Sequence, residues 1–188
     1  MNGRLIALIT VGAVAVVFAA YPFVRFAVKR ARLADRIKKL CAERGYLLRL
    51  ERKRPWLSTN RGERYDFAVE TPEKLFYVKL FGVLRRRNAL AIMGSRRYAI
   101  RKYIAFLGNK VGNTMMQAGG KERVFPDWFS ERKGINDKPA SNIILVNPVP
   151  ASVVVAVPGK SERYLTFGEE IDGTAFVSGN DISAYLSK

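Results

Sequence analysis

The two side chains with the clearest chemical potential lie on a predicted hairpin. Residues 64–70 (RYDFAVE) and 75–81 (LFYVKLF) are typical of strands, and the four residues between them form a turn. If Glu70 faces Leu75 across this turn, the register places Asp66 directly opposite Lys79 on one face of the sheet. A carboxylate opposed to a lysine can belong to a metal site or to an ordinary ion pair.

The order of elements around this hairpin resembles the restriction-endonuclease-like superfamily, including its nuclease-related modules. Members carry an Asp and, on the next strand, an (Asp/Glu)-x-Lys motif, in which two carboxylates hold magnesium and the lysine steadies the attacking water. Asp66 matches the first Asp and Lys79 matches the Lys, so the resemblance implies that these two are the catalytic residues. The second acid position is occupied by Tyr77, which is not a ligand carboxylate.

Under this resemblance the missing acid needs a substitute. Glu70 projects from the same face as Asp66, so Asp66 and Glu70 are the metal candidates, although about 13 Å of strand separates them. Glu43, on the preceding helix, stands where some members carry another acid. Magnesium is the only cofactor that this alternative implies, and the sequence otherwise predicts none. We expect no cleavage, because Tyr77 replaces the second carboxylate.

Three interpretations of Asp66 and Lys79 remain open. The favoured one is a cross-strand ion pair on the less apolar face of the sheet, contributing under about 1 kcal/mol. The second is a degenerate nuclease fold that binds without cutting, and the third is a working metal-dependent nuclease. In the first and second cases the protein is not an enzyme.

Composition restricts the remaining chemistry. The 188 residues contain no histidine and one cysteine, Cys41, which excludes Ser-His and Cys-His nucleophile pairs, multi-cysteine metal sites and internal disulfides. A phosphate-binding loop of the GxxxxGK[ST] type and the GxGxxG, GxSxG, HExxH and CxxC motifs are also missing. An enzyme built from this sequence would depend on carboxylates, lysine, tyrosine or hydroxyl groups.

Residues 5–24 (LIALITVGAVAVVFAAYPFV) form the longest apolar stretch, with no charged side chain. As a helix it would be about 30 Å long, the thickness of the hydrocarbon core of a bilayer. We therefore predict a transmembrane anchor over residues 1–24. A cleaved signal peptide, with cleavage before Ala20, is the alternative, and it would make the chain a secreted basic protein.

Basic residues follow the apolar stretch closely and predict its orientation. Seven Lys and Arg side chains lie between positions 25 and 39, whereas the other flank carries only Arg4 and the terminal amine. Basic flanks stay on the cytoplasmic side, so we predict a single-pass protein of the cell membrane with its C-terminal domain in the cytoplasm.

The net charge of +17 is concentrated near this anchor. Residues 1–110 carry 25 Lys and Arg against 7 Asp and Glu, while residues 111–188 carry 8 against 9. Anionic headgroups are the favoured partner of residues 25–54, and nucleic acid is a second candidate partner. A further anion-binding surface is predicted from basic residues later in the chain, and the sequence names no protein partner. These residues are Arg85, Arg86, Arg87, Arg96 and Arg97.

Residues 25–45 are predicted to form a basic juxtamembrane helix that ends at Gly45. Leu33, Ile37 and Cys41 belong to one apolar stripe of this helix, which either lies along the membrane or packs on the domain. The lone cysteine is interpreted as a small apolar member of the stripe rather than as a nucleophile.

Residues 46–188 are predicted to form one domain of the α+β (mixed α/β) class with a mixed central sheet. A first strand covers 46–51, and the apolar run 142–147 indicates a central strand that is buried on both faces. For residues 89–104 the sequence does not distinguish two strands from a helix. The favoured function is a membrane-anchored domain that binds an anionic surface or a partner without catalysis, and the alternative is a membrane-tethered, magnesium-dependent nuclease.

Overall fold

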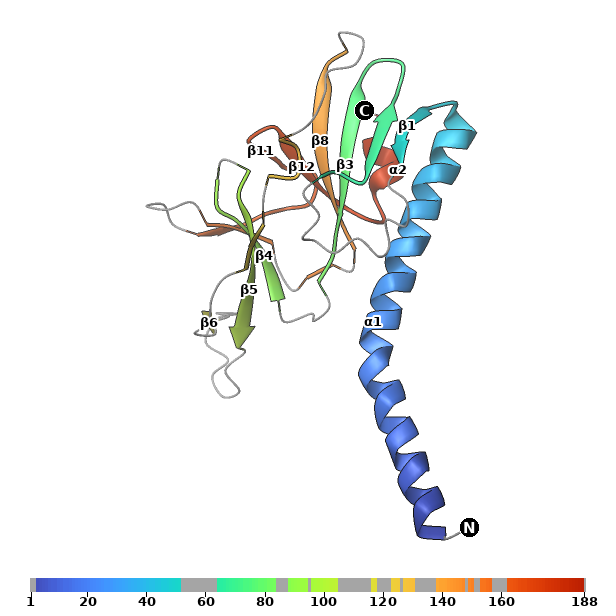
Figure 1. Ribbon diagram of the computed structural model, residues 1–188. Coiled ribbons are helices and arrows are strands. Elements are labelled where there is room, and N and C mark those ends of the chain that lie inside the picture. Colours follow the sequence, from blue (N-terminus) through green and yellow to red (C-terminus); the bar gives the residue numbers. More distant parts are fainter. Residues whose placement is uncertain are drawn as a thin grey trace.

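The computed structural model describes residues 3–51, 64–83, 88–94, 96–104, 116–117, 123–125, 127–130, 138–147, 149–150, 153–156 and 162–187. It begins with a single long helix, α1 (Gly3–Arg44), which keeps Pro22 in its interior (Figure 1). No break separates the predicted spanning segment from the predicted basic helix. Among the described residues, Ile9–Arg44 is the one helix long and apolar enough to cross a membrane.

The two halves of α1 have different surroundings. In the N-terminal half the most apolar window is 0% buried, and Phe18 is 75% exposed. In the C-terminal half the apolar stripe is buried against the domain, which decides between the two predicted locations of the stripe. The buried members of the stripe are Leu33, Ala34, Ile37, Leu40 and Cys41. Burial also raises the pKa of the Cys41 thiol, as expected for an apolar member of the core.

The end of α1 reverses the chain, as the sequence predicted. Gly45 adopts a φ of +67°, and the Tyr46 N–H donates to the Cys41 carbonyl at 2.9 Å. This hydrogen bond closes the last turn in the Schellman arrangement, in which glycine takes the left-handed position without a steric penalty. Strand β1 (Leu47–Glu51) therefore runs back along α1 toward its N-terminal half.

The first sheet continues from β1 and mixes antiparallel and parallel pairing. Its order is β1-β2-β3-β8-β12-β11, in which β8 is parallel to both of its neighbours and the other pairs are antiparallel. The remaining strands are β2 (Phe67–Glu70), β3 (Leu75–Phe81), β8 (Ala140–Val146), β11 (Glu170–Ile171) and β12 (Thr174–Ser178). Strand β8 is buried from Asn142 onward, which confirms the predicted central strand.

A second sheet was not predicted. Its order is β10-β9-β4-β5-β6, and β7 also pairs with β5. The strands are β4 (Asn88–Ile92), β5 (Tyr98–Ile104), β6 (Met116–Gln117), β7 (Arg123–Phe125), β9 (Val153–Val155) and β10 (Arg163–Tyr164). Strands β4 and β5 form an antiparallel hairpin, so residues 89–104, which the sequence left open, contain strands rather than a helix.

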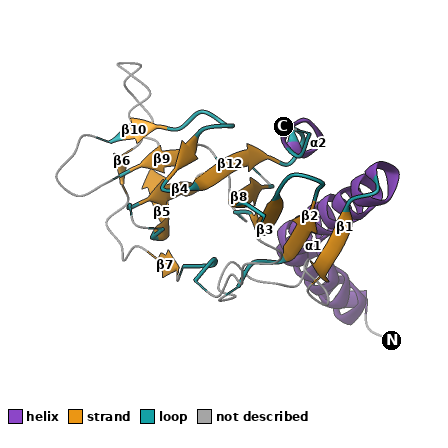
Figure 2. Cartoon of the chain, turned by 90° about the horizontal axis from the view of Figure 1, so that it is seen from above, coloured by secondary structure: helices purple, strands orange, loops and turns teal. Residues whose placement is uncertain are grey.

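The first sheet lies between the helices on one face and the second sheet on the other (Figure 2). On one face, α1 and the short helix α2 (Ile182–Tyr185) cover the first core cluster. On the other face, side chains of the second sheet cover the second cluster, so all seven residues of β3 are buried. The fold is α+β with mixed sheets, as predicted. The single central sheet of the prediction was incomplete, because a second sheet covers its far face.

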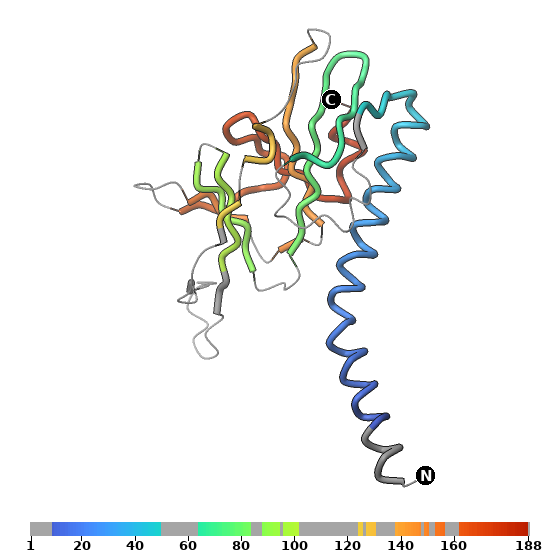
Figure 3. Tube along the Cα trace, viewed as in Figure 1, coloured from blue at the N-terminus to red at the C-terminus, as the bar shows by residue number. Residues whose placement is uncertain are grey.

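The two ends of the chain lie far apart. The trace in Figure 3 places the C-terminal residues beside the end of α1, while the N-terminus lies at the opposite tip of that helix. Side-chain contacts fix this arrangement: Arg44 Nη1 donates to Ser187 Oγ at 2.6 Å, and the Tyr46 hydroxyl donates to the Leu186 carbonyl at 3.4 Å. The C-terminal half of α1 is thus part of the domain.

Candidate functional site

Asp66 and Lys79 are brought together as the register predicted. Strand β2 pairs Phe67 with Val78 and Glu70 with Leu75, and the Asp66 N–H donates to the Val78 carbonyl at 2.8 Å. The Asp66 Oδ2 atom lies 3.6 Å from Lys79 Nζ. The turn between the two strands is what sets this pairing, because its four residues fix which positions oppose each other.

The environment of the pair differs from the expectation. Asp66 and Lys79 are both 0% exposed, because their face of the first sheet lies under the second sheet. Lys79 Nζ lies 5.6 Å from the ring centroid of Trp128, a residue of the second core cluster. The predicted cross-strand ion pair is confirmed, but its face is covered by the second core cluster rather than being the less apolar, exposed face. The estimate of under about 1 kcal/mol applies to exposed pairs, so it does not carry over to this buried one.

Arg30 of α1 is a third member of the cluster. Its side chain is 0% exposed, its Nη2 atom lies 4.0 Å from Asp66 Oδ2, and the same atom donates to the Leu80 carbonyl at 2.6 Å. Sequence reasoning missed this residue, although a signal was present. Arg30 precedes Leu33, Ala34 and Ile37 by three, four and seven positions, which places it on the buried face of the helix.

Arg30, Asp66 and Lys79 are called the buried charge cluster below. With all three groups ionised, it holds two positive charges and one negative charge. Asp66 Oδ2 also accepts the Leu80 N–H at 2.9 Å, and Lys79 Nζ donates to the Arg64 carbonyl at 2.7 Å. Buried charges are tolerated only when they are paired and hydrogen-bonded in this way. The cluster therefore joins α1 to the β2–β3 hairpin, and no member presents an exposed face to a substrate.

Tyr77 lies two residues before Lys79, at the acid position of the predicted motif, and it supplies no carboxylate. The side chain is 1% exposed and belongs to the second core cluster. Its ring centroid lies 4.6 Å from that of Tyr65. The position that would hold the second acid under the resemblance to the restriction-endonuclease-like superfamily is here an aromatic packing position.

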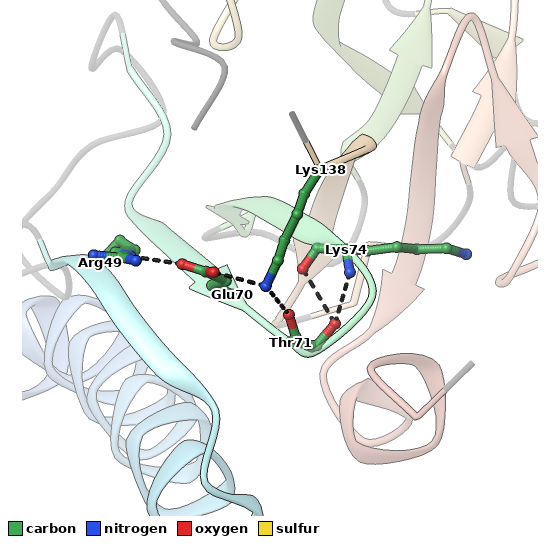
Figure 4. A network of polar contacts seen from close by, with 5 residues as sticks. All are labelled: Arg49, Glu70, Thr71, Lys74 and Lys138. Carbon is green, nitrogen blue, oxygen red and sulfur yellow. Dashed lines mark hydrogen bonds and ion pairs between the residues drawn. The ribbon is translucent and has the colours of Figure 1, made fainter. Parts of the chain in front are cut away.

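Glu70, the second metal candidate, is bound to other cations (Figure 4). Its Oε2 atom accepts from Arg49 Nε at 2.6 Å, and its Oε1 atom accepts from Lys138 Nζ at 2.7 Å. Lys138 also donates to the Thr71 carbonyl at 3.1 Å. The hydrogen bonds from Lys138 and Arg49 lower the pKa of Glu70. Both oxygens of Glu70 thus face cations that are separate from the buried charge cluster.

The described carboxylates do not form a metal-binding group. Glu43 lies on the exposed side of α1, where its Oε1 atom is 3.7 Å from Lys39 Nζ. Among the described residues, no group of three or more Asp, Glu, Cys or His side chains could hold a metal ion. The structure brings Asp66 and Lys79 together, but it pairs Glu70 and Glu43 with different basic residues.

The predicted anion-binding residues are only partly described. Arg85, Arg86 and Arg87 lie outside the described residues. Arg96 is in the β4–β5 turn with a φ of +58°, and its Nη1 atom is 3.7 Å from Asp127 Oδ2. Arg97 follows in the same turn and is exposed. Of the two predicted anion-binding residues that the structure describes, Arg96 is thus already paired with the carboxylate of Asp127.

Basic side chains of α1 border its apolar half directly. Arg25, Lys29 and Arg32 form a proximal basic cluster, in which Arg25 and Arg32 are exposed and Lys29 is half-buried. Further along the helix, Arg36 contacts the domain, because its Nη1 atom donates to the Gly179 carbonyl at 3.1 Å. The proximal basic cluster is the part of α1 where cationic side chains meet the exposed apolar segment.

Comparison with known proteins adds no relative to this picture. No family model, curated protein or solved structure matches the chain. The resemblance to the restriction-endonuclease-like superfamily rests on Asp66, Lys79 and the order of elements. The geometry around these two residues is that of a buried structural cluster that connects a helix to a hairpin.

Proposed function

We propose that this chain is a single-pass membrane protein whose cytoplasmic domain binds an anionic lipid surface without catalysis. Residues 5–24 span the bilayer, and the proximal basic cluster contacts the headgroups of the cytoplasmic leaflet. The observation that carries the proposal is the contrast within α1: its apolar window is 0% buried, while the remainder of the same helix is part of the domain. Exposed apolar helix of this length is unstable in water and stable in lipid.

Charge supports the orientation and the partner. The proximal basic cluster follows the apolar segment, and basic flanks are retained on the cytoplasmic side. Anionic headgroups attract each nearby Lys or Arg with about 1 kcal/mol, within a Debye length of about 8 Å. Arg25 is one residue beyond Val24, so its charge lies within that distance of the hydrocarbon boundary.

Protease protection tests the topology. Protease added outside intact cells should spare the C-terminal domain, and disruption of the membrane should expose it. Replacing Arg25, Lys29 and Arg32 with Gln should increase the inverted fraction, because it removes the charges that retain this flank. Digestion of the wild-type domain from outside would contradict the orientation, and a mature N-terminus at Ala20 would contradict the anchor.

Vesicle binding tests the lipid partner. Residues 25–188 should bind vesicles containing phosphatidylglycerol at low salt and dissociate as salt is added, because the attraction is screened. The Gln triple variant of the proximal basic cluster should lose most of this binding. Arg44→Gln is the matched control, because about 30 Å of helix separates it from Val24. Equal loss in both variants would contradict a headgroup contact at the proximal basic cluster.

Catalysis at Asp66 is not part of the proposal. Asp66 and Lys79 are 0% exposed, and both carboxylate oxygens of Glu70 accept from Arg49 and Lys138. We expect purified protein to leave nucleic acid intact in the presence of magnesium. Magnesium-dependent cleavage that a folded Lys79→Met variant no longer performs would establish the nuclease alternative instead.

A further inference from the structure

One side of α1 stays apolar beyond the point where the basic residues begin. Val28 is 41% exposed, although Arg25, Lys29 and Arg32 lie around it on the helix. Four residues, about 6 Å of helix, separate Val28 from Val24, so Val28 lies within the headgroup layer, which is about 5–8 Å thick. Lipid tails therefore do not reach this side chain, and the domain leaves it exposed.

This side of α1 points away from the domain. Nine residues, about two and a half turns, separate Val28 from Ile37, which is 0% exposed in the first core cluster. The two side chains hence lie on opposite sides of the helix. In Figure 1 the labelled strands lie to one side of α1. The side with Val28 is therefore the one on which another helix can pack.

Apolar side chains continue this side of α1 into the bilayer at the spacing of a coiled-coil seam. Counting back from Val28 in steps of four and three residues gives Val24, Tyr21, Val17 and Val14, and these five side chains are 41% to 66% exposed. They are called the exposed seam below. A mean spacing of 3.5 residues keeps a stripe between two helices that wrap around each other with a left-handed twist. β-Branched valines are stiff at χ1, so little side-chain freedom is lost when they pack.

The part of the exposed seam outside the hydrocarbon is what selects this side. Within the bilayer every side of α1 is apolar, so spacing alone does not favour one side over another. Beyond Val24, the seam continues at Val28 and Ala31 among basic residues, and it ends at Asp35, which is exposed. An apolar stripe that extends past the lipid tails needs an apolar cover that lipid does not supply.

The charges beside the exposed seam fit a second copy of the chain. In a parallel pair of helices, the residue after one seam position faces the residue before the next seam position of the other helix. Arg25 of one copy would thus face Ala20 of the second, and Arg32 would face Ala27. Cations then face alanines rather than other cations, and the small alanines let the two helices approach closely.

We infer that the exposed seam binds the exposed seam of a second copy, so that two α1 helices form a parallel pair. The inference rests on the proposed function, because copies anchored in the same orientation must pair in parallel. Each Val28 is covered by the other copy. The contact is isologous, and the two domains lie on the outer sides of the pair.

Disulfide formation between copies measures which side of α1 pairs. Cys41 is the single cysteine and is buried, so the full chain with Cys41→Ala permits one reporter at Val24→Cys or, as the matched control, at Phe23→Cys. Phe23 is 63% exposed at nearly the same depth, but it lies about 100° around the helix from Val24. In phosphatidylcholine vesicles, oxidation should give several-fold more covalent dimer from position 24. Equal yields would indicate random collision and would overturn the inference.

Ala19→Cys tests a competing pair through small residues. Ala15 and Ala19 are four positions apart, a spacing that lets transmembrane helices approach closely. Eighteen residues, about five full turns, separate Ala19 from Ile37, so both lie on the side of α1 that carries the domain. Pairing there would bring both domains between the helices, and we expect little dimer from position 19. A higher yield from position 19 than from position 24 would overturn the inference.

A charge variant tests the seam outside the hydrocarbon. In the Val24→Cys chain, Val28→Lys should lower the yield of covalent dimer several-fold, because two lysines would then face each other across the pair. The added charge is basic, so it does not oppose the predicted orientation. Ala42→Lys is the matched control, because it adds the same charge at an exposed position of α1 beyond Asp35. An unchanged yield in Val28→Lys would contradict the pairing.

The proposed function has a separate readout in the same vesicles. Alkaline carbonate should leave the wild-type chain in the vesicles, because an integral helix resists extraction. A chain that carbonate removes would contradict the membrane span itself. A chain that stays in the vesicles, yet gives equal yields from positions 23 and 24, would contradict only the pairing of α1.

Discussion

The β2–β3 hairpin carries two carboxylates that are each flanked by two cations, but the two groups differ in their access to water. Asp66 precedes β2 and is 0% exposed between Arg30 and Lys79. Glu70 ends β2 and is 10% exposed between Arg49 and Lys138. The cations around Glu70 reach water, since Arg49 is 39% and Lys138 29% exposed, whereas all three side chains of the buried charge cluster are 0% exposed. We therefore expect the charges around Asp66 to contribute more to the stability of the fold than the charges around Glu70.

The largest expected effect is that of Asp66→Asn. The change leaves Arg30 and Lys79 buried without their counter-charge, which costs about 3–5 kcal/mol when one partner of a buried pair is removed. Urea unfolding of the full chain in mild detergent, followed by tryptophan fluorescence, should show this loss. A change below about 1 kcal/mol would mean that Asp66 behaves like an exposed residue, and the contrast with Glu70 would fail.

Lys79→Met should destabilise the protein less than Asp66→Asn. Removing the lysine leaves one carboxylate and one guanidinium, so the cluster becomes neutral rather than more positive. The remaining cost is the hydrogen bond to the Arg64 carbonyl, about 1–2 kcal/mol. The same unfolding measurement ranks the two variants. If Lys79→Met proved the more costly change, the charge balance assigned to the cluster would be incorrect.

Glu70→Gln should have the smallest effect and the clearest dependence on pH. Its cations lower the pKa of Glu70 below the ordinary value of 4.5. The stabilising contribution is therefore present above about pH 4.5, and it is lost as the pH falls through the lowered folded-state pKa. The melting temperatures of wild type and Glu70→Gln should differ at about pH 7 and converge at about pH 3. High salt at neutral pH should also reduce the difference, and a gap that persisted under both conditions would show a contribution unrelated to charge.

Local sequence patterns were sufficient to predict the register of the β2–β3 hairpin and the buried stripe and end of α1. The four-residue turn fixes which residues of β2 and β3 oppose each other, so the sequence alone pairs Asp66 with Lys79 correctly. The spacing of Leu33, Ile37 and Cys41 likewise identifies the buried stripe, and Gly45 identifies the end of α1. These features depend on neighbours in the chain, whose geometry is set by helix and strand periodicity.

Tertiary structure decided how much each polar residue matters. Alternation along a strand separates two faces, but it does not say whether a second sheet covers the face that holds Asp66 and Lys79. Arg30 and Lys138 lie 36 residues before Asp66 and 68 residues after Glu70, so no local pattern could pair them. The sequence by itself determined the apolar segment, the register and the charged residues. Only the packing of distant segments determined which charges lost their water, because burial is a property of the whole fold.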